Sequence, residues 1–322
     1  MQNLIIFKKK INKFNKKISV PGDKSLSIRW VLFSSLATGI SKAQNLLHSE
    51  DVLSAIKSIQ KLGIKVILNK KFCKIYGQGF DGYKYKKNLL LNARNSGTLG
   101  RLILGLLINS PTSIKLIGDK SLSKRDFKRI ADPLKMFGAN FKLNKNKTLP
   151  LVIKGSQNLK PIYYNENKGS AQCKSSVIFG GMRTVGETII KAKKSRNHTE
   201  LLCKYLGLPI KVKNNKNYDL IKINKVKKIK SLNYKIPSDI SSASFFIVLT
   251  ALSNKSKLII KNVNVNPTRI GIVNILKKMG VKINLINKKK YKGEKVADIH
   301  VYGSENFKSL NCPPKLNSGA ID

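Results

Sequence analysis

Apolar and polar positions along the chain form a block that repeats four times. In the first block, a turn at Lys24-Ser25 precedes a helical pattern over 28–36, and a second helical pattern over 52–62 leads into strand-like residues 64–68. The later blocks open with polar turns near residues 95, 169 and 241. Each block closes with a glycine after its second helix, at Gly63, Gly138, Gly207 and Gly280. Because glycine readily adopts the left-handed conformation that ends a helix, we expect all four to cap helices.

The spacing of these glycines predicts the architecture. They lie roughly 70 residues apart, and each block holds a helix, a strand, a second helix and one or two further strands. The fold class is therefore α/β, and a length of 322 residues favours two domains. We expect the opening turns to present backbone donors to one central cleft. Residues 317–322 resemble the opening turn of a fifth block, so we expect the sequence to be a fragment of a longer protein.

The composition adds a strong positive charge. The formal net charge is +47, and only eight of the 63 basic residues are arginine. Lysines are spread along the whole chain with many asparagines and isoleucines, which is typical of an A/T-rich genome rather than of a nucleic-acid-binding face. A positive field attracts anions, so the charge suits an enzyme that acts on phosphorylated metabolites.

Other features argue against several classes of protein. The four cysteines have no C-x-x-C spacing, so we expect neither a metal site nor a disulfide framework, and we expect a reducing, cytoplasmic location. The longest apolar run, over 243–252, is too short to span a bilayer. The first 14 residues contain no small-residue cleavage site, so we do not expect them to be a signal peptide.

Candidate binding residues lie at the opening turns. Lys24 and Ser25 stand where a turn opens a helix, and backbone N–H groups there favour anions. Arg29 follows about one helical turn later, so the three side chains can converge on one ligand. In the second opening turn, over 95–101, Gly97 allows a ligand to approach the backbone closely. Each of these turns also fits an ordinary solvated helix cap.

Further polar turns supply arginines and amide donors. Arg125 ends a basic turn, and in a chain so rich in lysine an arginine indicates fork-like recognition of carboxylate or phosphate. Residues 170–175 add hydroxyl and amide donors, and Arg196 lies in another turn. His198 is expected to be a capping or surface residue, and Thr199 with Glu200 simply to start a helix. If a substrate hydroxyl must be deprotonated, Asp322 is the best-placed carboxylate.

These motifs together resemble one enzyme family, 3-phosphoshikimate 1-carboxyvinyltransferase, which is the enolpyruvylshikimate-phosphate synthase of aromatic amino-acid synthesis. The matching motifs cover essentially the whole chain in the right order, and their form resembles the bacterial branch called class II. They are Pro-Gly-Asp-Lys-Ser at 21–25 with Arg29, Asn-x-Gly-Thr-x-x-Arg at 95–101, Gly-Asp-x-Ser-Leu-x-x-Arg at 118–125, Ser-Ala-Gln-x-Lys-Ser at 170–175 and Ser-Arg-x-His-Thr-Glu at 195–200.

The resemblance implies the enolpyruvyl transferase fold, an inside-out α/β barrel of two domains with three repeats each and the active site between them. One domain would comprise 21–237, and the other 1–20 plus 238–322. The second domain would be incomplete, because family members carry about two more repeats after the position of Asp322. Those repeats bring residues that complete the phosphoenolpyruvate site, so the resemblance leaves the activity of this chain by itself in question.

The resemblance also implies roles for individual residues. Asp322 would take the proton from the 5-hydroxyl of shikimate 3-phosphate, and Lys24 would neutralise charge and move protons. The expected shikimate 3-phosphate ligands are Lys24, Ser25, Arg29, Ser170, Ala171, Gln172, Arg196 and Asp322. The expected phosphoenolpyruvate ligands are Lys24, Gly97, Arg125 and Gln172. The herbicide glyphosate occupies the phosphoenolpyruvate site in this family, and many class II relatives carry alanine where this chain has Gly97.

The family needs no cofactor and no metal, and we expect a monomer with no nucleic-acid or membrane partner. Two alternatives predict different behaviour. The sister enzyme that acts on UDP-N-acetylglucosamine would show Lys-Asn in place of Lys24-Ser25 and a cysteine in the second repeat. A basic nucleic-acid-binding protein, suggested only by the charge, would show steeply salt-dependent retention on DNA.

Overall fold

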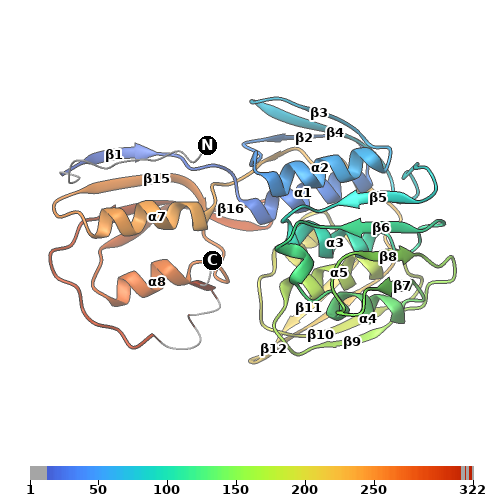
Figure 1. Ribbon diagram of the computed structural model, residues 1–322. Coiled ribbons are helices and arrows are strands. Elements are labelled where there is room, and N and C mark those ends of the chain that lie inside the picture. The colour runs from blue at the N-terminus through green and yellow to red at the C-terminus, as the bar shows by residue number, and fades with distance from the viewer. Residues whose placement is uncertain (1–12, 313–315, 317–318, 321–322) are drawn as a thin grey trace. The chain divides into compact units, whose positions relative to one another are not determined.

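The computed structural model describes residues 13–312, 316 and 319–320 (Figure 1). The chain divides into two compact units. Unit 1 comprises 1–21, 237–291 and 295–322, and unit 2 comprises 22–236 and 292–294. Asp322, the expected base, lies outside the described residues.

Unit 2 contains three sheets that share one strand pattern. In each, an edge strand pairs in parallel with the first strand of a block, and the two later strands of the block complete the sheet with antiparallel pairing. The first sheet has the order β13-β2-β4-β3, and β14 also pairs with β2. Its strands are β2 (Ala37–Gln44), β3 (Lys65–Leu68), β4 (Phe72–Gln78), β13 (Ile229–Lys230) and β14 (Tyr234–Lys235).

The other two sheets of unit 2 have the orders β5-β6-β8-β7 and β11-β12-β10-β9. The strands of the former are β5 (Leu89–Asn92), β6 (Ile114–Ile117), β7 (Asn140–Leu143) and β8 (Leu151–Lys154). Those of the latter are β9 (Tyr163–Glu166), β10 (Thr188–Lys193), β11 (Ile210–Asn214) and β12 (Tyr218–Ile223). The edge strands β13 and β14 come from the last segment of unit 2 and pair with β2 of its first block, so the three repeats close on themselves.

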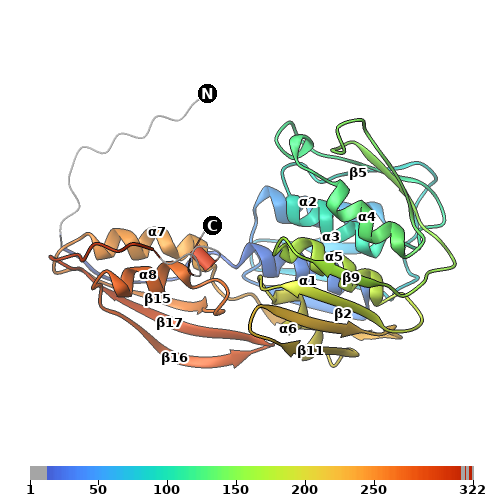
Figure 2. The ribbon, with the colours of Figure 1, turned by 90° about the horizontal axis from the view of Figure 1, so that it is seen from below.

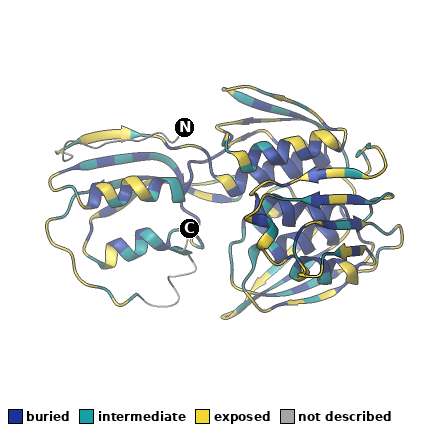
Figure 3. Ribbon diagram, viewed as in Figure 1, coloured by how far each residue is buried: buried dark blue, intermediate teal, exposed yellow. Residues whose placement is uncertain are grey.

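The helices of unit 2 fall into two kinds. Each block begins with a helix that is buried almost all round, and α3 contacts both α1 and α5. The second helix of each block is amphipathic and covers a sheet. The buried helices are α1 (Lys24–Leu36), α3 (Gly97–Leu106) and α5 (Ala171–Gly181) (Figures 2 and 3). The covering helices are α2 (Glu50–Lys61), α4 (Lys128–Met136) and α6 (His198–Tyr205), and a 3-10 turn, η1 (Leu122–Lys124), precedes α4.

Large side chains between the three buried helices form the core of unit 2. Trp30, Phe33 and Phe179 are fully buried, and the rings of Phe33 and Phe179 lie with their centroids 5.0 Å apart. The Trp30 indole Nε1 donates to the Leu232 carbonyl at 2.9 Å, which joins α1 to the segment that closes the ring of repeats.

Unit 1 repeats the same pattern once. Its sheet has the order β1-β15-β17-β16, with β1 parallel and β17 antiparallel to β15. Two helices lie on one face of this sheet and share a core with it (Figure 2). The strands are β1 (Asn15–Ile18), β15 (Lys257–Asn264), β16 (Ile283–Tyr291) and β17 (Glu294–Tyr302), and the helices are α7 (Ile240–Ala251) and α8 (Gly271–Lys278). On α7, two aromatic side chains face solvent: Phe245 is 78% and Phe246 42% exposed.

The repeat predicted from the sequence is confirmed in each block. All four closing glycines have positive φ angles of 66–110° directly after a helix, as helix-ending glycines require (the values are 91° at Gly63, 110° at Gly138, 66° at Gly207 and 94° at Gly280). The helical patterns over 28–36 and 52–62 correspond to α1 and α2, and the apolar run over 243–252 corresponds to α7.

Candidate active site

The buried helices of unit 2 open in similar ways. An oxygen of the residue before each helix accepts a hydrogen bond from a backbone N–H in the first turn. Asp23 accepts from Leu26 at 2.9 Å, Ser96 accepts from Leu99 at 3.3 Å, and the third cap, Ser170, accepts from Cys173 at 3.3 Å. Each cap satisfies one donor and leaves others at the helix start to bind an anion.

Side-chain contacts show that α3 and α5 open at the same end of unit 2. The Gln172 amide nitrogen Nε2 donates to Thr98 Oγ1 at 3.1 Å, and Arg101 Nη1 donates to Gln172 Oε1. Both contacts join the first turns of the two helices. Gln172 is therefore fixed in orientation, with its amide nitrogen toward α3 at Thr98 and its oxygen held by Arg101.

Arg29 joins the buried helix α1 to α5 and α6. Its Nε donates to Thr199 Oγ1 at 2.8 Å, Nη2 donates to Ser175 Oγ at 3.2 Å, and Nη1 donates to the Ser25 carbonyl at 3.2 Å. The side chain is 3% exposed, and burial, opposed by the Glu200 carboxylate, lowers the pKa of Arg29 to about 10. The positive charge of Arg196 adds a small contribution to this lowering of the pKa of Arg29.

The structure brings Gly97 and Arg125 together. A β-carbon added to Gly97 would lie 3.1 Å from Nη1 of Arg125 and 3.6 Å from Nη1 of Arg101. Arg125 is exposed, and its Nη2 donates to Asn95 Oδ1 at 3.4 Å. The absence of a side chain at Gly97 therefore leaves a small space, tight even for a methyl group, against the guanidinium groups of Arg125 and Arg101.

Arg101 is a site residue that the sequence analysis did not assign. It is 5% exposed, its guanidinium lies 5.6 Å from the centre of the Phe127 ring, and its carbonyl accepts from Ser176 Oγ at 2.9 Å. Burial and repulsion from Arg129 and Arg125 lower the pKa of Arg101 to about 10. The available signal was its place in the motif 95–101, one helical turn after Gly97.

The remaining expected ligands take different positions around this end of unit 2. Lys24 is exposed in the first turn of α1, whereas Ser25 beside it is buried. Ser170 and Ala171 are half-buried at the start of α5, and Arg196 is half-buried in the turn before α6.

The structure corrects the expectations for the start of α6. His198 is neither a surface residue nor the cap, since Asn197 precedes the helix and His198 is completely buried. Its Nδ1 lies 2.7 Å from Glu294 Oε1. Thr199 and Glu200 do more than start a helix: Thr199 accepts from Arg29, and Glu200 Oε1 lies 2.7 Å from the buried Lys174 Nζ. Sequence reasoning missed these roles because every partner comes from another element.

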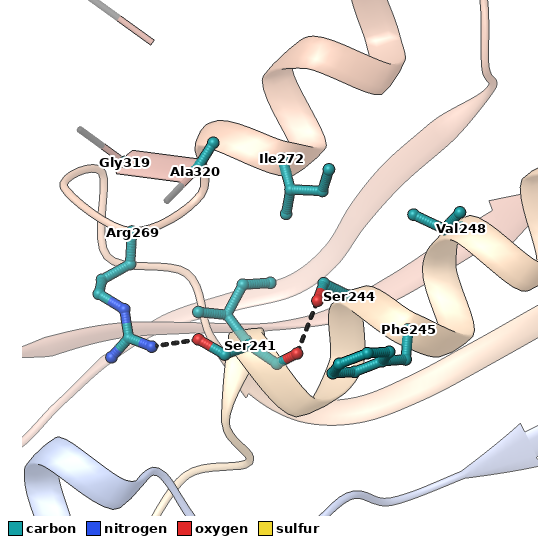
Figure 4. A pocket seen from close by; sticks show the side chains of 9 residues that line it. Ser241, Ser244, Phe245, Val248, Arg269, Ile272, Gly319 and Ala320 are labelled. Carbon is teal, nitrogen blue, oxygen red and sulfur yellow. Dashed lines mark hydrogen bonds between the residues drawn. The ribbon is translucent and has the colours of Figure 1, made fainter. Parts of the chain in front are cut away.

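Unit 1 has a similar helix opening with a small pocket. At the start of α7, Arg269 Nη2 donates to Ser241 Oγ at 2.6 Å (Figure 4). The same nitrogen also donates to Asp239 Oδ1 at 3.3 Å. The pocket beside it has a volume of about 290 Å³ and a mixed polar and apolar lining. Its labelled lining residues are Ser241, Ser244, Phe245, Val248, Arg269, Ile272, Gly319 and Ala320 (Figure 4).

Within residues 13–312, 316 and 319–320, no three His, Cys, Asp or Glu side chains are grouped so that they could hold a metal ion. Over the same residues, each helix is too short or too polar to cross a bilayer.

Known proteins match both the sequence and the structure. A sequence model described as EPSP synthase (3-phosphoshikimate 1-carboxyvinyltransferase) matches residues 8–314. The 3-phosphoshikimate 1-carboxyvinyltransferase of Ruthia magnifica subsp. Calyptogena magnifica is 41% identical over 98% of this chain and 71% of its own length. That of Caldicellulosiruptor bescii is 40% identical over 92% of this chain and 68% of its own length.

A solved EPSP synthase from Acinetobacter baumannii matches the structure with a TM-score of 0.87 and 35% identity. The match covers 96% of this chain and 70% of that protein. These relatives do not favour the alternative enzyme that acts on UDP-N-acetylglucosamine, and the resemblance seen in the motifs is confirmed. The chain belongs to the EPSP synthase (3-phosphoshikimate 1-carboxyvinyltransferase) family.

Proposed function

We propose that this chain transfers the enolpyruvyl group of phosphoenolpyruvate to the 5-hydroxyl of shikimate 3-phosphate and releases phosphate. The relatives are named for this transfer. Both substrates are anions with a phosphate and a carboxylate, so a site for them requires several donors and cations. The observation that carries the proposal is the contact of α3 with α5 through Thr98, Gln172 and Arg101, beside the side-chain-free space at Gly97.

The shikimate 3-phosphate half of the site is proposed to comprise Lys24, Ser25, Arg29, Ser170, Ala171, Gln172 and Arg196. Within this set Arg29 has a distinct place, because all three of its guanidinium nitrogens donate to oxygens of the protein. It therefore fixes α1 relative to α5 and α6 and adds positive charge close to the ligand. Lys24 and Arg196 are the more accessible cations and would contact the ligand directly.

The phosphoenolpyruvate half is proposed to comprise Lys24, Gly97, Arg125 and Gln172. Arg125 is exposed beside the space at Gly97, and Gln172 is already oriented by Thr98 and Arg101. A phosphate placed against Gly97 would face the guanidinium groups of Arg125 and Arg101 and relieve their mutual repulsion. This geometry favours a doubly charged ligand over a neutral one.

The proposed chemistry has two steps. The 5-hydroxyl of shikimate 3-phosphate loses its proton to a base and attacks C2 of the enolpyruvyl group, while C3 is protonated. The tetrahedral adduct then loses phosphate and a C3 proton to restore the double bond. Lys24, at the first turn of α1, would offset the charge that develops on the substrates. Asp322, the proposed base, lies outside the described residues.

Binding tests the proposal directly. Titration calorimetry with shikimate 3-phosphate should show saturable binding by the purified chain, and Lys24→Met should weaken it by about a hundredfold, as expected for loss of a cation that contacts phosphate. Lys57→Met removes the same charge from an exposed position on α2 and serves as the matched control. Equal affinities for the two variants would contradict the assignment of Lys24.

A further inference from the structure

The turn that joins β16 to β17 belongs to unit 2 and lies along one face of α6. Lys292 and Glu294 contact this helix through their side chains, and Gly293 between them lies close to its backbone. Lys292 Nζ donates to Tyr205 OH at 2.9 Å, and a β-carbon on Gly293 would lie 2.6 Å from the Leu201 carbonyl. The contacted residues of α6 are 198, 201 and 205, a spacing that places them on one helical face.

The turn approaches α6 so closely that only glycine fits at its centre. Gly293 has a φ of 89°, which an L side chain rarely adopts, and the Leu201 carbonyl would clash with any β-carbon there. The position of Glu294 relative to His198 is thus set by the backbone of the turn.

His198 and Glu294 form a pair that is sealed from water. The exposed fraction is 0% for His198 and 1% for Glu294, and His198 Nδ1 lies 2.7 Å from Glu294 Oε1. The second ring nitrogen, Nε2, is also buried and has no hydrogen-bond partner among the described residues. Burial of a half-satisfied imidazole and a carboxylate opposes folding, so an apolar pair would pack here at less cost. The proposed function offers a reason for such a pair at this place.

The pair stands two residues from Arg196. The first turn of α6 has three consecutive side chains with partners on different elements: His198 contacts Glu294, Thr199 contacts Arg29 and Ser175, and Glu200 contacts Lys174. The contacts to α1 and α5 hold this turn from one side, and the Glu294 contact holds it from another. Together these contacts fix the start of α6, and with it the direction in which residues Ser195–Asn197 enter the helix.

We propose that His198 and Glu294 are positioning residues that hold the Arg196 turn in place to receive the phosphate of shikimate 3-phosphate. The inference rests on the proposed function, in which Arg196 contacts that ligand. Neither residue touches substrate in this scheme. The His198 Nδ1–H donates to the Glu294 carboxylate, and this bond transmits the position of the Lys292–Glu294 turn to the start of α6.

The test compares two ligands that differ only in the phosphate. Calorimetry on the full 322-residue chain would measure the affinities for shikimate 3-phosphate and for shikimate. We expect His198→Ala and Glu294→Ala each to weaken shikimate 3-phosphate binding about tenfold, as small displacements of a positioned group do, and shikimate binding less than about twofold. The double variant should bind no more weakly than the weaker single variant, because each single variant already lacks the shared His198–Glu294 contact.

Two conservative variants separate positioning from folding. His198→Asn places an amide nitrogen near the position of Nδ1 and should retain the preference for the phosphorylated ligand, whereas His198→Gln reaches the Nε2 position instead and should lose it. Lys292→Ala removes an exposed contact of the same turn and should change neither affinity. Thermal unfolding of each variant identifies any that do not fold.

Several outcomes would overturn the inference. They are unchanged affinity in a folded His198→Ala or Glu294→Ala variant, equal loss for both ligands, or equal behaviour of the Asn and Gln variants. Arg196→Ala distinguishes failure of the inference from failure of the proposed function. If Arg196→Ala abolishes the preference for phosphate while the His198 variants do not, only the inference fails. If Arg196→Ala leaves the preference intact, the proposed role of Arg196 fails.

Discussion

The ion pair between Lys174 and Glu200 allows a quantitative test of the core of unit 2. Lys174 Nζ lies 2.7 Å from Glu200 Oε1, and the two side chains are 0% and 4% exposed. The proposed change is Glu200→Gln, which keeps the shape of the side chain and removes its charge. The Lys174 ammonium would then remain buried without its carboxylate.

The expected loss of stability is large. Breaking a buried ion pair by removing one partner costs about 3–5 kcal/mol, because the remaining charge is shielded from water and loses its close counter-charge. Glu200 is also the largest favourable charge acting on Arg29, so its removal leaves two buried cations poorly compensated. For a unit of this size the loss corresponds to a fall in Tm of about 10 °C.

Replacing both partners should restore most of the stability. Lys174→Met with Glu200→Gln removes both charges, and we expect the double variant to lie within about 1.5 kcal/mol of wild type. The exposed pair of Arg94 Nη1 and Glu50 Oε1, 2.6 Å apart, provides the matched control in the same unit. Glu50→Gln should cost less than about 1 kcal/mol, because water screens both groups.

The assay uses the only tryptophan of the chain. Trp30 is completely buried in α1, so its fluorescence reports the unfolding of unit 2 in urea even if unit 1 unfolds separately. Glu200→Gln should lower the urea midpoint strongly, and Glu50→Gln should lower it only slightly. A loss below about 1 kcal/mol for Glu200→Gln, or a double variant as unstable as the sum of its single variants, would refute the reasoning.

Three further changes test the site and the core. Gly97→Ala should displace Arg125, because its Nη1 would lie 3.1 Å from the new methyl. We expect the binding of phosphoenolpyruvate to weaken by about tenfold and that of glyphosate by more. Superimposable glyphosate inhibition curves for the variant and wild type would contradict this. Burial raises the pKa of Asp219, so the folded state binds its proton more tightly and stability falls as pH rises above the ordinary pKa of 3.8. Asp219→Asn should therefore raise Tm at pH 7 and abolish that part of the pH dependence. A lower Tm of the variant at pH 7 would disprove this. Arg29→Lys should lower the free energy of unfolding by about 1–3 kcal/mol, because one ammonium cannot satisfy three separate acceptors. In the same urea assay, the exposed control Arg94→Lys should change it by less than about 0.5 kcal/mol.

Local signals explain why the repeat was predictable. A helix-ending glycine and the helical spacing of apolar residues depend on neighbours within one turn, so Gly63 and the helix before it are visible in the sequence. The short edge strands are different, because β13 spans only Ile229–Lys230 and two residues show no alternation. Its partner β2 lies about 190 residues earlier, and only the closed ring of repeats brings them together.

The candidate site shows the same division. The turns at Lys24-Ser25 and around Gly97 were found because the residues that favour anions follow one another in sequence. The contacts that fix their orientation join distant residues: Arg29 to Thr199 across 170 positions, and His198 to Glu294 across 96. A single sequence does not pair such residues, so it could suggest residue types for the candidate site but not the network of contacts around them.

The eight arginines show where the reasoning from composition needs refinement. In a chain dominated by lysine, retained arginine was expected to mark recognition of a substrate, but several guanidinium groups donate to the protein itself. Arg29 has three acceptors in the protein, and Arg269 has two. Arg183 Nη2 donates to the Phe80 carbonyl at 2.7 Å, and its Nη1 lies 3.6 Å from Asp81 Oδ1. Arginine is retained where several acceptors lie in one plane, because a lysine ammonium cannot reach them together.

Arg125 fits the original expectation best, since it is exposed, stands beside the space at Gly97 and has a single long contact, to Asn95, in the described part of the chain. Under the proposed function, a bound phosphoenolpyruvate would supply further acceptors to this guanidinium.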